Sequence, residues 1–148
     1  MKLSTKGRYG ARAMLELALH YGEGPILLKN IAARQDISVR YLEHIMTMLI
    51  SGGLVNSTRG RVGGFSLAKA PSEITLCEVV ELVEGSIAPT SCVDDDKLCP
   101  RSDKCITRDI WVNMKKAMMG SICTITLADM VEMHHKKSNQ TSPNIYHI

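Results

Sequence analysis

The alternation of apolar and polar residues predicts three helices in the first 51 residues. In residues 5–21 apolar side chains recur every three or four positions, the spacing of one helix face, and the repeat ends at a segment with Gly22, Gly24 and Pro25. The same spacing predicts a short helix over 28–35 and a third over 39–51. The apolar stripe of the third helix consists of Leu42, Ile45, Met46 and Leu49.

Residues 28–51 have the layout of a helix-turn-helix. The turn Asp36-Ile37-Ser38 separates the two helices, and in this motif the second helix enters the DNA major groove. Its outer face carries charged and hydrogen-bonding side chains of the kind that contact bases and phosphates. The residues expected to bind DNA there are Ser38, Arg40, Tyr41, Glu43 and His44.

Two short alternating segments, 54–58 and 65–67, flank the sequence RGRVGG and predict a β-hairpin wing. Its glycines permit positive φ angles and a close approach to a ligand, and its arginines can reach phosphates or the minor groove. We therefore add Arg59, Gly60 and Arg61 to the candidate DNA-binding residues. A flexible surface loop without a ligand is the alternative.

The second half of the chain predicts a long helix that needs a partner. A fourth helix ends at Gly85, a polar segment follows over 86–104, and from Ile106 apolar residues recur every four positions. Pairing with the same helix of a second subunit would cover this apolar seam, and a two-fold dimer would place two wings on a palindromic DNA site. Packing of the seam on its own domain is the alternative.

The predicted fold is mainly α, a winged helix-turn-helix with a small β-hairpin wing plus a long dimerisation helix. With one Trp, one Phe and four Tyr, the core must be built from aliphatic residues and Met, as is usual for helical packing. We expect a DNA-binding domain over 1–70 and a loop with dimerisation helices over 71–133, the last of them at 127–133. A disordered polar tail is expected over 134–148.

The net charge of +3 is unevenly distributed. Residues 1–70 contain ten Lys and Arg against four Asp and Glu, whereas residues 71–148 contain eight against eleven. A basic half indicates a polyanionic partner, here double-stranded DNA, although solvated surface charge would give the same count.

No run of about 18 apolar residues occurs, and the basic start MKLSTKGRYG is not followed by an apolar signal core. We therefore expect a cytoplasmic protein without a membrane span. In that reducing compartment five cysteines indicate metal or redox chemistry rather than structural disulfides. Cys77, inside the fourth predicted helix, is expected to be a core thiol.

Three cysteines, Cys92, Cys99 and Cys105, lie close together on the polar segment, with six and then five residues between them. Three thiolates are ligands for a soft metal. Zinc loops usually supply cysteine pairs about two to four residues apart, which are absent here, so the spacing favours an iron–sulfur cluster. Zinc, a thiol redox switch and inert cysteines stay as alternatives.

Several segments together resemble one bacterial family. These are LSTKGRYG, ISVRYLEHIMTMLISGGLV, STRGRVGGFSLAK and the three-cysteine loop followed by CITRDIW. Over about residues 1–133 they resemble the IscR-like iron–sulfur transcription regulators, winged-helix proteins that include NsrR, RirA and CymR. The resemblance implies a homodimer whose 2Fe-2S or 4Fe-4S cluster state decides which promoters it binds. It also implies cluster ligation by Cys92, Cys99 and Cys105, a minor-groove role for Arg59 and a role in site choice for Glu43.

The sequence departs from this family at the fourth cluster ligand. IscR-like proteins have a histidine three residues after the third cysteine, where this chain has Arg108, a cation without a lone pair. Some relatives use a carboxylate or histidine in the first helix, where this chain has Arg8 and Arg12. The first cysteine spacing is also one residue longer than in IscR. Other candidate fourth ligands are Asp103, Asp109, Glu43 and His44.

The predicted function is a homodimeric DNA-binding transcriptional regulator that senses iron–sulfur status or redox and nitric oxide stress through the cluster. One alternative is a cluster-free regulator that senses through free thiols. Another is an iron–sulfur redox protein whose basic half binds an acidic partner protein. No enzyme is expected, because the sequence lacks a Gly-rich phosphate loop, a nucleophile elbow and a His-Glu zinc motif.

Overall fold

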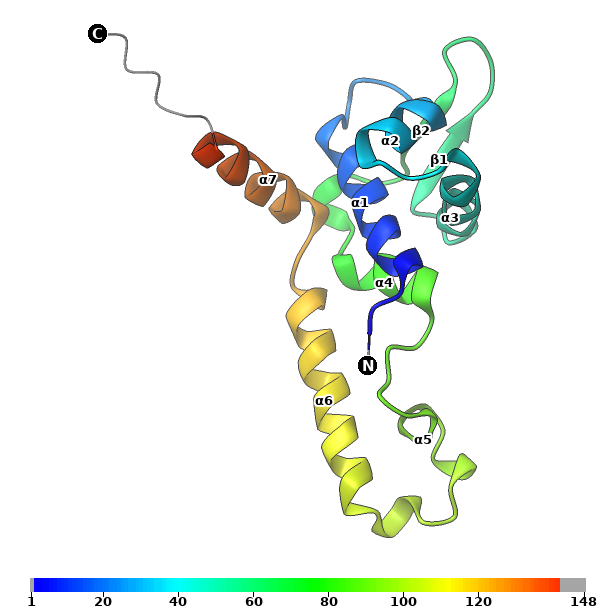
Figure 1. Ribbon diagram of the computed structural model, residues 1–148, viewed down its shortest axis with the longest axis vertical. Coiled ribbons are helices and arrows are strands. Elements are labelled where there is room, and N and C mark those ends of the chain that lie inside the picture. The colour runs from blue at the N-terminus through cyan, green and yellow to red at the C-terminus, as the bar shows by residue number, and fades with distance from the viewer. Residues whose placement is uncertain (1, 142–148) are drawn as a thin grey trace, which may run out of the picture.

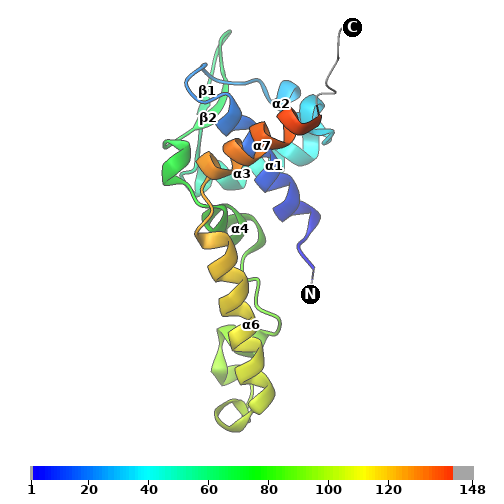
Figure 2. The same cartoon turned by 90° about the vertical axis from the view of Figure 1, so that its left-hand side faces the viewer.

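A computed structural model describes residues 2–141 of the chain. The predicted mainly α fold with one β-hairpin is confirmed. Figures 1 and 2 show a body from which α6 extends, with the α5 region beside the far part of α6. The elements are α1 (Thr5–Leu19), α2 (Leu28–Gln35), α3 (Val39–Ser51), β1 (Val55–Thr58), β2 (Gly64–Leu67), α4 (Leu76–Glu84), α5 (Ser91–Asp94), α6 (Ile106–Cys123) and α7 (Leu127–Thr141). Short 3-10 turns lie at Pro71–Glu73, Asp96–Leu98 and Ser102–Lys104.

Side-chain caps mark the starts of α1 and α3. The Ser4 hydroxyl accepts hydrogen bonds from two backbone N–H groups at the start of α1, and Ser38 accepts one from the backbone N–H of Tyr41 at the start of α3. Such caps stabilise a helix by about 1 kcal/mol each. Between α2 and α3, Asp36 takes a left-handed conformation with φ 51°, which Asp tolerates better than most residues. The two helices therefore meet in the tight turn of a helix-turn-helix.

The core lies where α1, α2, α3 and α4 meet, and α7 covers one side of it. The predicted inward stripe of α3 is confirmed, because all four of its apolar residues are buried. Full burial of one such side chain contributes about 1.5–3 kcal/mol, so the stripe fixes the rotation of α3 about its axis. The largest fully buried residues include Met14, Ile31, Leu42, Ile45, Met46, Leu49, Ile74 and Leu127.

The hairpin wing is antiparallel, with Val55 opposite Leu67 and Thr58 opposite Gly64. A further bridge joins Phe65 to Ile26 in the α1–α2 connection through two backbone hydrogen bonds, of 2.8 and 2.9 Å. Gly64 lies so close to this bridge that an added Cβ atom would be 2.4 Å from the Ile26 carbonyl oxygen. The bridge thus ties the base of the wing to the body.

The segment before α4 pairs with the α6–α7 connection. Thr75 and Thr126 form an isolated antiparallel bridge, in which Leu76 N–H donates to Ile125 at 2.8 Å and Leu127 N–H donates to Ile74 at 2.9 Å. Beside this bridge a disulfide joins Cys77 to Cys123. Cys77 is buried as expected, but the expectation of a core thiol is wrong, because its sulfur is bonded to Cys123. Tertiary packing brings these two cysteines together across a sequence separation of 46 residues.

Helix α7 is longer than predicted. The predicted helix over 127–133 continues to Thr141, so residues 134–141 are helical rather than disordered. The Ser138 hydroxyl donates to the His134 carbonyl at 3.0 Å, and Lys136 pairs with Glu132 at 3.8 Å. These local contacts extend a polar helix that Leu127 anchors in the core. The remainder of the predicted tail lies outside the described residues.

Helix α6 packs against α4 of the body toward its C-terminal end. All of Ile106–Cys123 is described, and none of its residues is buried. The exposed fractions of Ile106 and Ile110 are 73% and 52%. Met118 and Ile122 are half-buried and line a groove with Leu76 and Val80 of α4. The apolar seam predicted for this helix is therefore left largely open within one subunit.

Candidate nucleic-acid interface and cysteine loop

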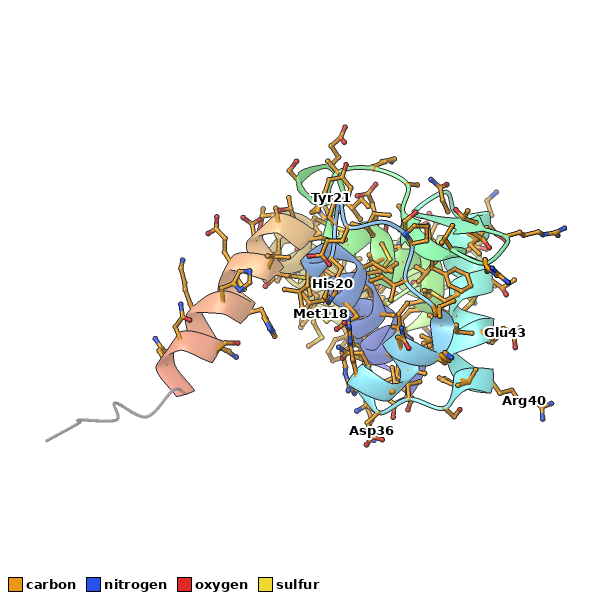
Figure 3. The ribbon with its side chains drawn as sticks, turned by 90° about the horizontal axis from the view of Figure 1, so that it is seen from above. His20, Tyr21, Asp36, Arg40, Glu43 and Met118 are labelled. Atoms are coloured by element: carbon orange, nitrogen blue, oxygen red, sulfur yellow. A yellow bond between two sulfur atoms is a disulfide. The ribbon has the colours of Figure 1, made fainter. Side chains whose placement is uncertain are left out.

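The outer face of α3 presents the polar side chains that the sequence assigned to DNA. Arg40, Glu43 and His44 are exposed, and Figure 3 shows Arg40 and Glu43 pointing outward from the body. Ser38 is exposed as well, although its hydroxyl accepts the capping hydrogen bond. Together with Tyr41, three of these residues line one hollow at the start of α3. The arrangement leaves donors, acceptors and a cation free to meet the edges of bases.

Tyr41 has a second, structural role. Its ring packs edge-on against Tyr9 of α1, with ring centroids 5.8 Å apart. Arg8 and Arg12 lie over the Tyr9 ring at 6.0 and 5.5 Å, and Arg12 also donates to the Gln35 side chain. In the sequence these two arginines were notable only because they cannot serve as cluster ligands. Their four-residue spacing on α1 was the signal for a cationic ridge beside α3.

The wing carries its arginines at the tip. Arg59, Gly60 and Arg61 are exposed, and Gly60 has a φ of 106°, which favours glycine. The loop closes through a hydrogen bond from Gly63 N–H to the Gly60 carbonyl at 3.1 Å. The hairpin lies next to α3, which β1 contacts (Figure 1). All the candidate DNA-binding residues are thus on one winged-helix body.

A buried carboxylate joins α1 to α2. The exposed fraction of Glu16 is 5%, and its two oxygens accept hydrogen bonds from Arg34 and Gln35, both at 2.8 Å. Burial alone would raise the pKa of Glu16, but these hydrogen bonds and the charges of Arg34 and His20 lower it below its ordinary value. Sequence reasoning missed this residue, whose only signal was an acidic side chain among apolar neighbours.

The three candidate cluster ligands lie on one loop. Cys92 is in α5, Cys99 follows a 3-10 turn and Cys105 immediately precedes α6; all three are half-buried free thiols. The buried Ser102 hydroxyl donates to the Asp96 and Cys99 carbonyls at 2.6 and 2.8 Å, which orders the loop. Within residues 2–141, no three His, Cys, Asp or Glu side chains converge as a metal site. The structure therefore places the thiols on one loop without assembling them.

Two cations of α6 tether this loop. Arg108 donates from Nε to the Cys92 carbonyl at 2.8 Å, and Lys115 pairs with Asp94 at 2.6 Å. Two hydrogen bonds lower the pKa of Asp94: the larger effect comes from Lys115 and a smaller one from Ser86. Arg108, a residue that the sequence excluded as a fourth ligand, thus contacts the backbone of the cysteine loop. At the start of the same helix, hydrogen bonds with the Thr107 hydroxyl and Arg108 N–H lower the pKa of the Cys105 thiol.

The donor set fits iron in its chemistry, because three thiolates are soft ligands of the kind that iron–sulfur clusters take. The fourth position is not assigned. Arg8 donates to the Thr5 hydroxyl at 3.1 Å and Arg12 is bonded to Gln35. Of the other candidates, Asp103 lies in the loop and Asp109 in the first turn of α6, whereas Glu43 and His44 lie on α3.

The helix-turn-helix, its arginine-bearing wing and the extended α6 define a winged-helix transcriptional regulator. A family model described as "Rrf2: Iron-dependent Transcriptional regulator" matches residues 3–133, and the chain belongs to this family. It is 40% identical over 150 residues to "Protein rrf2" of Nitratidesulfovibrio vulgaris, covering 99% of this chain and 100% of that protein. Membership of a family of transcriptional regulators agrees with the expectation that the protein is not an enzyme.

Solved structures of named regulators share this fold. The T. potens IscR structure is 36% identical, with a TM-score of 0.78 over 99% of this chain and 97% of that one. The structure of CymR, the global cysteine regulator of B. subtilis, is also 36% identical, with a TM-score of 0.75 over 90% and 98% of the two chains. The resemblance to the IscR-like family is thus confirmed. Across residues 2–141, no helix has the length and apolarity to cross a membrane.

Proposed function

We propose that this regulator is a homodimer that binds palindromic promoter DNA through α3 and the wing. It senses iron–sulfur status, or redox and nitric oxide stress, through a cluster held by Cys92, Cys99 and Cys105. One observation carries the proposal: a loop with three free thiols lies against α6, while the same chain presents an open polar recognition helix. The family's description as iron-dependent supports the metal.

The DNA half of the proposal assigns a role to each exposed group. Arg40 reaches guanine or phosphate in the major groove, and Glu43 accepts a hydrogen bond from cytosine N4 and disfavours bases without a donor. Ser38, Tyr41 and His44 complete that surface at the start of α3. The wing places Arg59 in a narrow minor groove, with Gly60 permitting close approach and Arg61 on phosphate.

In the cluster half, Cys92, Cys99 and Cys105 hold the cluster, which when bound supplies an iron centre that oxygen, nitric oxide or iron limitation can attack. Arg108 and Lys115 hold the Cys92 region against α6. Any rearrangement of the loop is therefore passed to α6, whose exposed seam pairs the two subunits. Incomplete thiolate ligation suits a labile sensor better than an electron carrier.

The salt dependence of DNA binding tests the first half. Duplexes selected from a randomised pool would be titrated by fluorescence anisotropy at several salt concentrations. We expect a log–log slope of about −0.9 per neutralised phosphate, corresponding to at least about four phosphates per dimer. An Arg59→Ala, Arg61→Ala variant should bind more weakly with a shallower slope, whereas Lys136→Ala, on α7, should match the wild type. Salt-insensitive binding would overturn the assignment.

Iron and acid-labile sulfide content, with an absorption spectrum, tests the second half on protein purified without oxygen. Both elements should be present in the wild type and absent from a Cys92→Ala, Cys99→Ala, Cys105→Ala variant. Their stoichiometry separates 2Fe-2S from 4Fe-4S. A Cys77→Ser, Cys123→Ser variant is the matched control and should keep the cluster. Wild-type protein that lacks both elements after reconstitution would overturn the cluster.

The second candidate is a cluster-free regulator that senses through free thiols. It is favoured by the arrangement of the three cysteines, which within residues 2–141 do not converge as a ligand set. In that case reconstituted protein contains no iron, and oxidation of the loop thiols alone changes the affinity for DNA.

A further inference from the structure

Two cysteines outside the loop meet at the junction of α4 and α6. Cys77 is the second residue of α4 and Cys123 is the last residue of α6, and their Cα atoms are 4.5 Å apart. The two are bonded to each other, while the three loop cysteines are free. Chromosomal DNA lies in a reducing compartment, where a disulfide is usually transient and redox-active rather than a permanent brace. This pair is therefore a candidate for reversible chemistry.

The two sulfurs have different environments. The exposed fraction of Cys77 is 7%, whereas Cys123 is only half-buried, so an outside reagent reaches Cys123 first. Cys77 lies in the first turn of α4, where the positive end of the helix dipole favours a thiolate. Such a sulfur is a good leaving group when a reductant attacks its partner. The pair therefore has an attacked sulfur and a stabilised leaving sulfur.

The disulfide joins α4 to the C-terminal end of the long helix α6. Helix α6 has 18 residues, or about 27 Å at the usual helical rise, and its N-terminal part stands clear of the body (Figures 1 and 2). A rotation of about 10° at the base would thus displace the far end by about 5 Å. Without the disulfide, the junction keeps the Leu76–Ile125 and Leu127–Ile74 hydrogen bonds, which hold α7 and leave α6 less constrained.

We propose that Cys77 and Cys123 form a second redox site, a reversible dithiol–disulfide pair that takes peroxide as its oxidant and fixes the direction of α6. The Cys123 thiolate attacks peroxide, the O–O bond breaks, and a sulfenic acid forms with release of water. The Cys77 thiolate then attacks that sulfur, the S–O bond breaks, and a second water leaves. A dithiol reductant attacks Cys123, Cys77 departs as a thiolate, and a second attack by the reductant restores both thiols and leaves the reductant as a disulfide.

This site is separate from the cysteine loop, which lies at the other end of α6. The predicted effect on DNA binding rests on the proposed function. If two α6 helices pair in a dimer, the direction of α6 sets the distance between the two recognition helices. The disulfide form, with α6 fixed, should bind a palindromic duplex about five- to tenfold more tightly than the dithiol form. The reason is that the entropy cost of ordering α6 on binding DNA is smaller when the disulfide already holds it. The affinity for a half-site duplex should be equal in both forms.

The test uses the full chain with Cys92→Ser, Cys99→Ser and Cys105→Ser, so that only the junction pair remains, with wild-type protein in parallel. Protein treated with peroxide and then with dithiothreitol would be followed by intact mass and by non-reducing peptide mapping. We expect loss and recovery of two hydrogens and a linked peptide containing Cys77 and Cys123. An added Cys77→Ser change should stop the reaction at a Cys123 sulfenic acid, which dimedone traps.

Hydrogen exchange and DNA binding separate the possible failures. Oxidation should slow amide exchange at the C-terminal end of α6, and only the palindrome should discriminate the two forms. Thiols that stay unlinked in folded protein, a disulfide that dithiothreitol does not reduce, or unchanged exchange on oxidation would overturn the proposal. If neither duplex binds either form, the DNA-binding function fails instead, and mass and exchange still decide the redox site.

Discussion

Glu16 of α1 accepts hydrogen bonds from two residues of α2, and this contact is expected to stabilise the packing of the two helices. We expect Glu16→Gln to lower the free energy of unfolding by about 1–3 kcal/mol, because hydrogen bonds from Arg34 and Gln35 to a charged acceptor are lost. Urea denaturation measures this loss. Glu23→Gln, which removes an exposed carboxylate that pairs with His20, should have little effect.

The same residue predicts a dependence of stability on pH. The folded-state pKa of Glu16 lies below its ordinary value of 4.5, so its contribution is fully present above that pH and is lost as the pH falls through the lower, folded value. The difference in unfolding free energy between wild type and Glu16→Gln should therefore shrink in acid below about pH 4.5. A difference that stays constant down to pH 3 would contradict the assignment.

Glu43 predicts an effect on specificity rather than on stability. Its side chain is exposed on α3, so Glu43→Ala should leave the unfolding midpoint unchanged. If the carboxylate accepts from cytosine N4, the variant should lose about 1–3 kcal/mol of discrimination against other bases at one position. Selection from a randomised duplex pool measures this. An unaltered consensus would show that Glu43 is only a solvated helix charge.

At the scale of elements, the wing depends on a close approach of backbone to backbone at Gly64. Gly64→Ala places a methyl group against the Ile26 carbonyl and should lower stability by about 1–3 kcal/mol and weaken DNA binding. Gly120→Ala is the control, since a Cβ atom on this α6 residue meets nothing within 4 Å and should stabilise the helix by about 0.5–1 kcal/mol. Thermal unfolding compares the two.

The loop of three cysteines depends on its tethers to α6. Arg108→Met removes the hydrogen bond to the Cys92 carbonyl, so amide exchange in residues 92–104 should rise by about tenfold, as expected for one bond to a charged donor. Lys116→Met, a change of an exposed side chain on the same helix, should leave exchange unaltered. Equal exchange in both variants would mean that other contacts order the loop.

Over the whole molecule, the sequence predicted what local periodicity determines. The stripe containing Leu42 and Ile45 fixed both the bounds and the rotation of α3, because every stripe residue is buried by its neighbours in the motif. The Cys77–Cys123 bond and the Ile26–Phe65 bridge depend on contacts between distant segments and leave no local pattern. The polar end of α7 has no apolar repeat, which is why its extent was underestimated.

The cysteine loop shows the same division in the candidate site. Residue type and spacing identified Cys92, Cys99 and Cys105 as soft ligands, and the structure keeps them on one loop. The role of Arg108 could not be predicted. The sequence shows that Arg108 cannot be a ligand, but it does not show that its side chain contacts the Cys92 carbonyl. Chemical type is thus encoded locally, whereas assembly of a site is a property of the fold.

The open seam of α6 makes the oligomeric state the most consequential property of the whole molecule. Ile106, Ile110 and Met114 leave apolar surface exposed, which a second α6 would cover. In the proposed dimer, Ile110→Glu removes two side chains that are each already about half-buried in one subunit, so the loss is about 1.5–3 kcal/mol, and the dimer dissociation constant should rise about ten- to a hundredfold. Sedimentation velocity should then show a folded monomer that binds half-sites and no longer binds palindromes tightly. Met133→Glu, an exposed apolar position on α7, should stay dimeric, and a wild-type monomer at micromolar concentration would contradict pairing through α6.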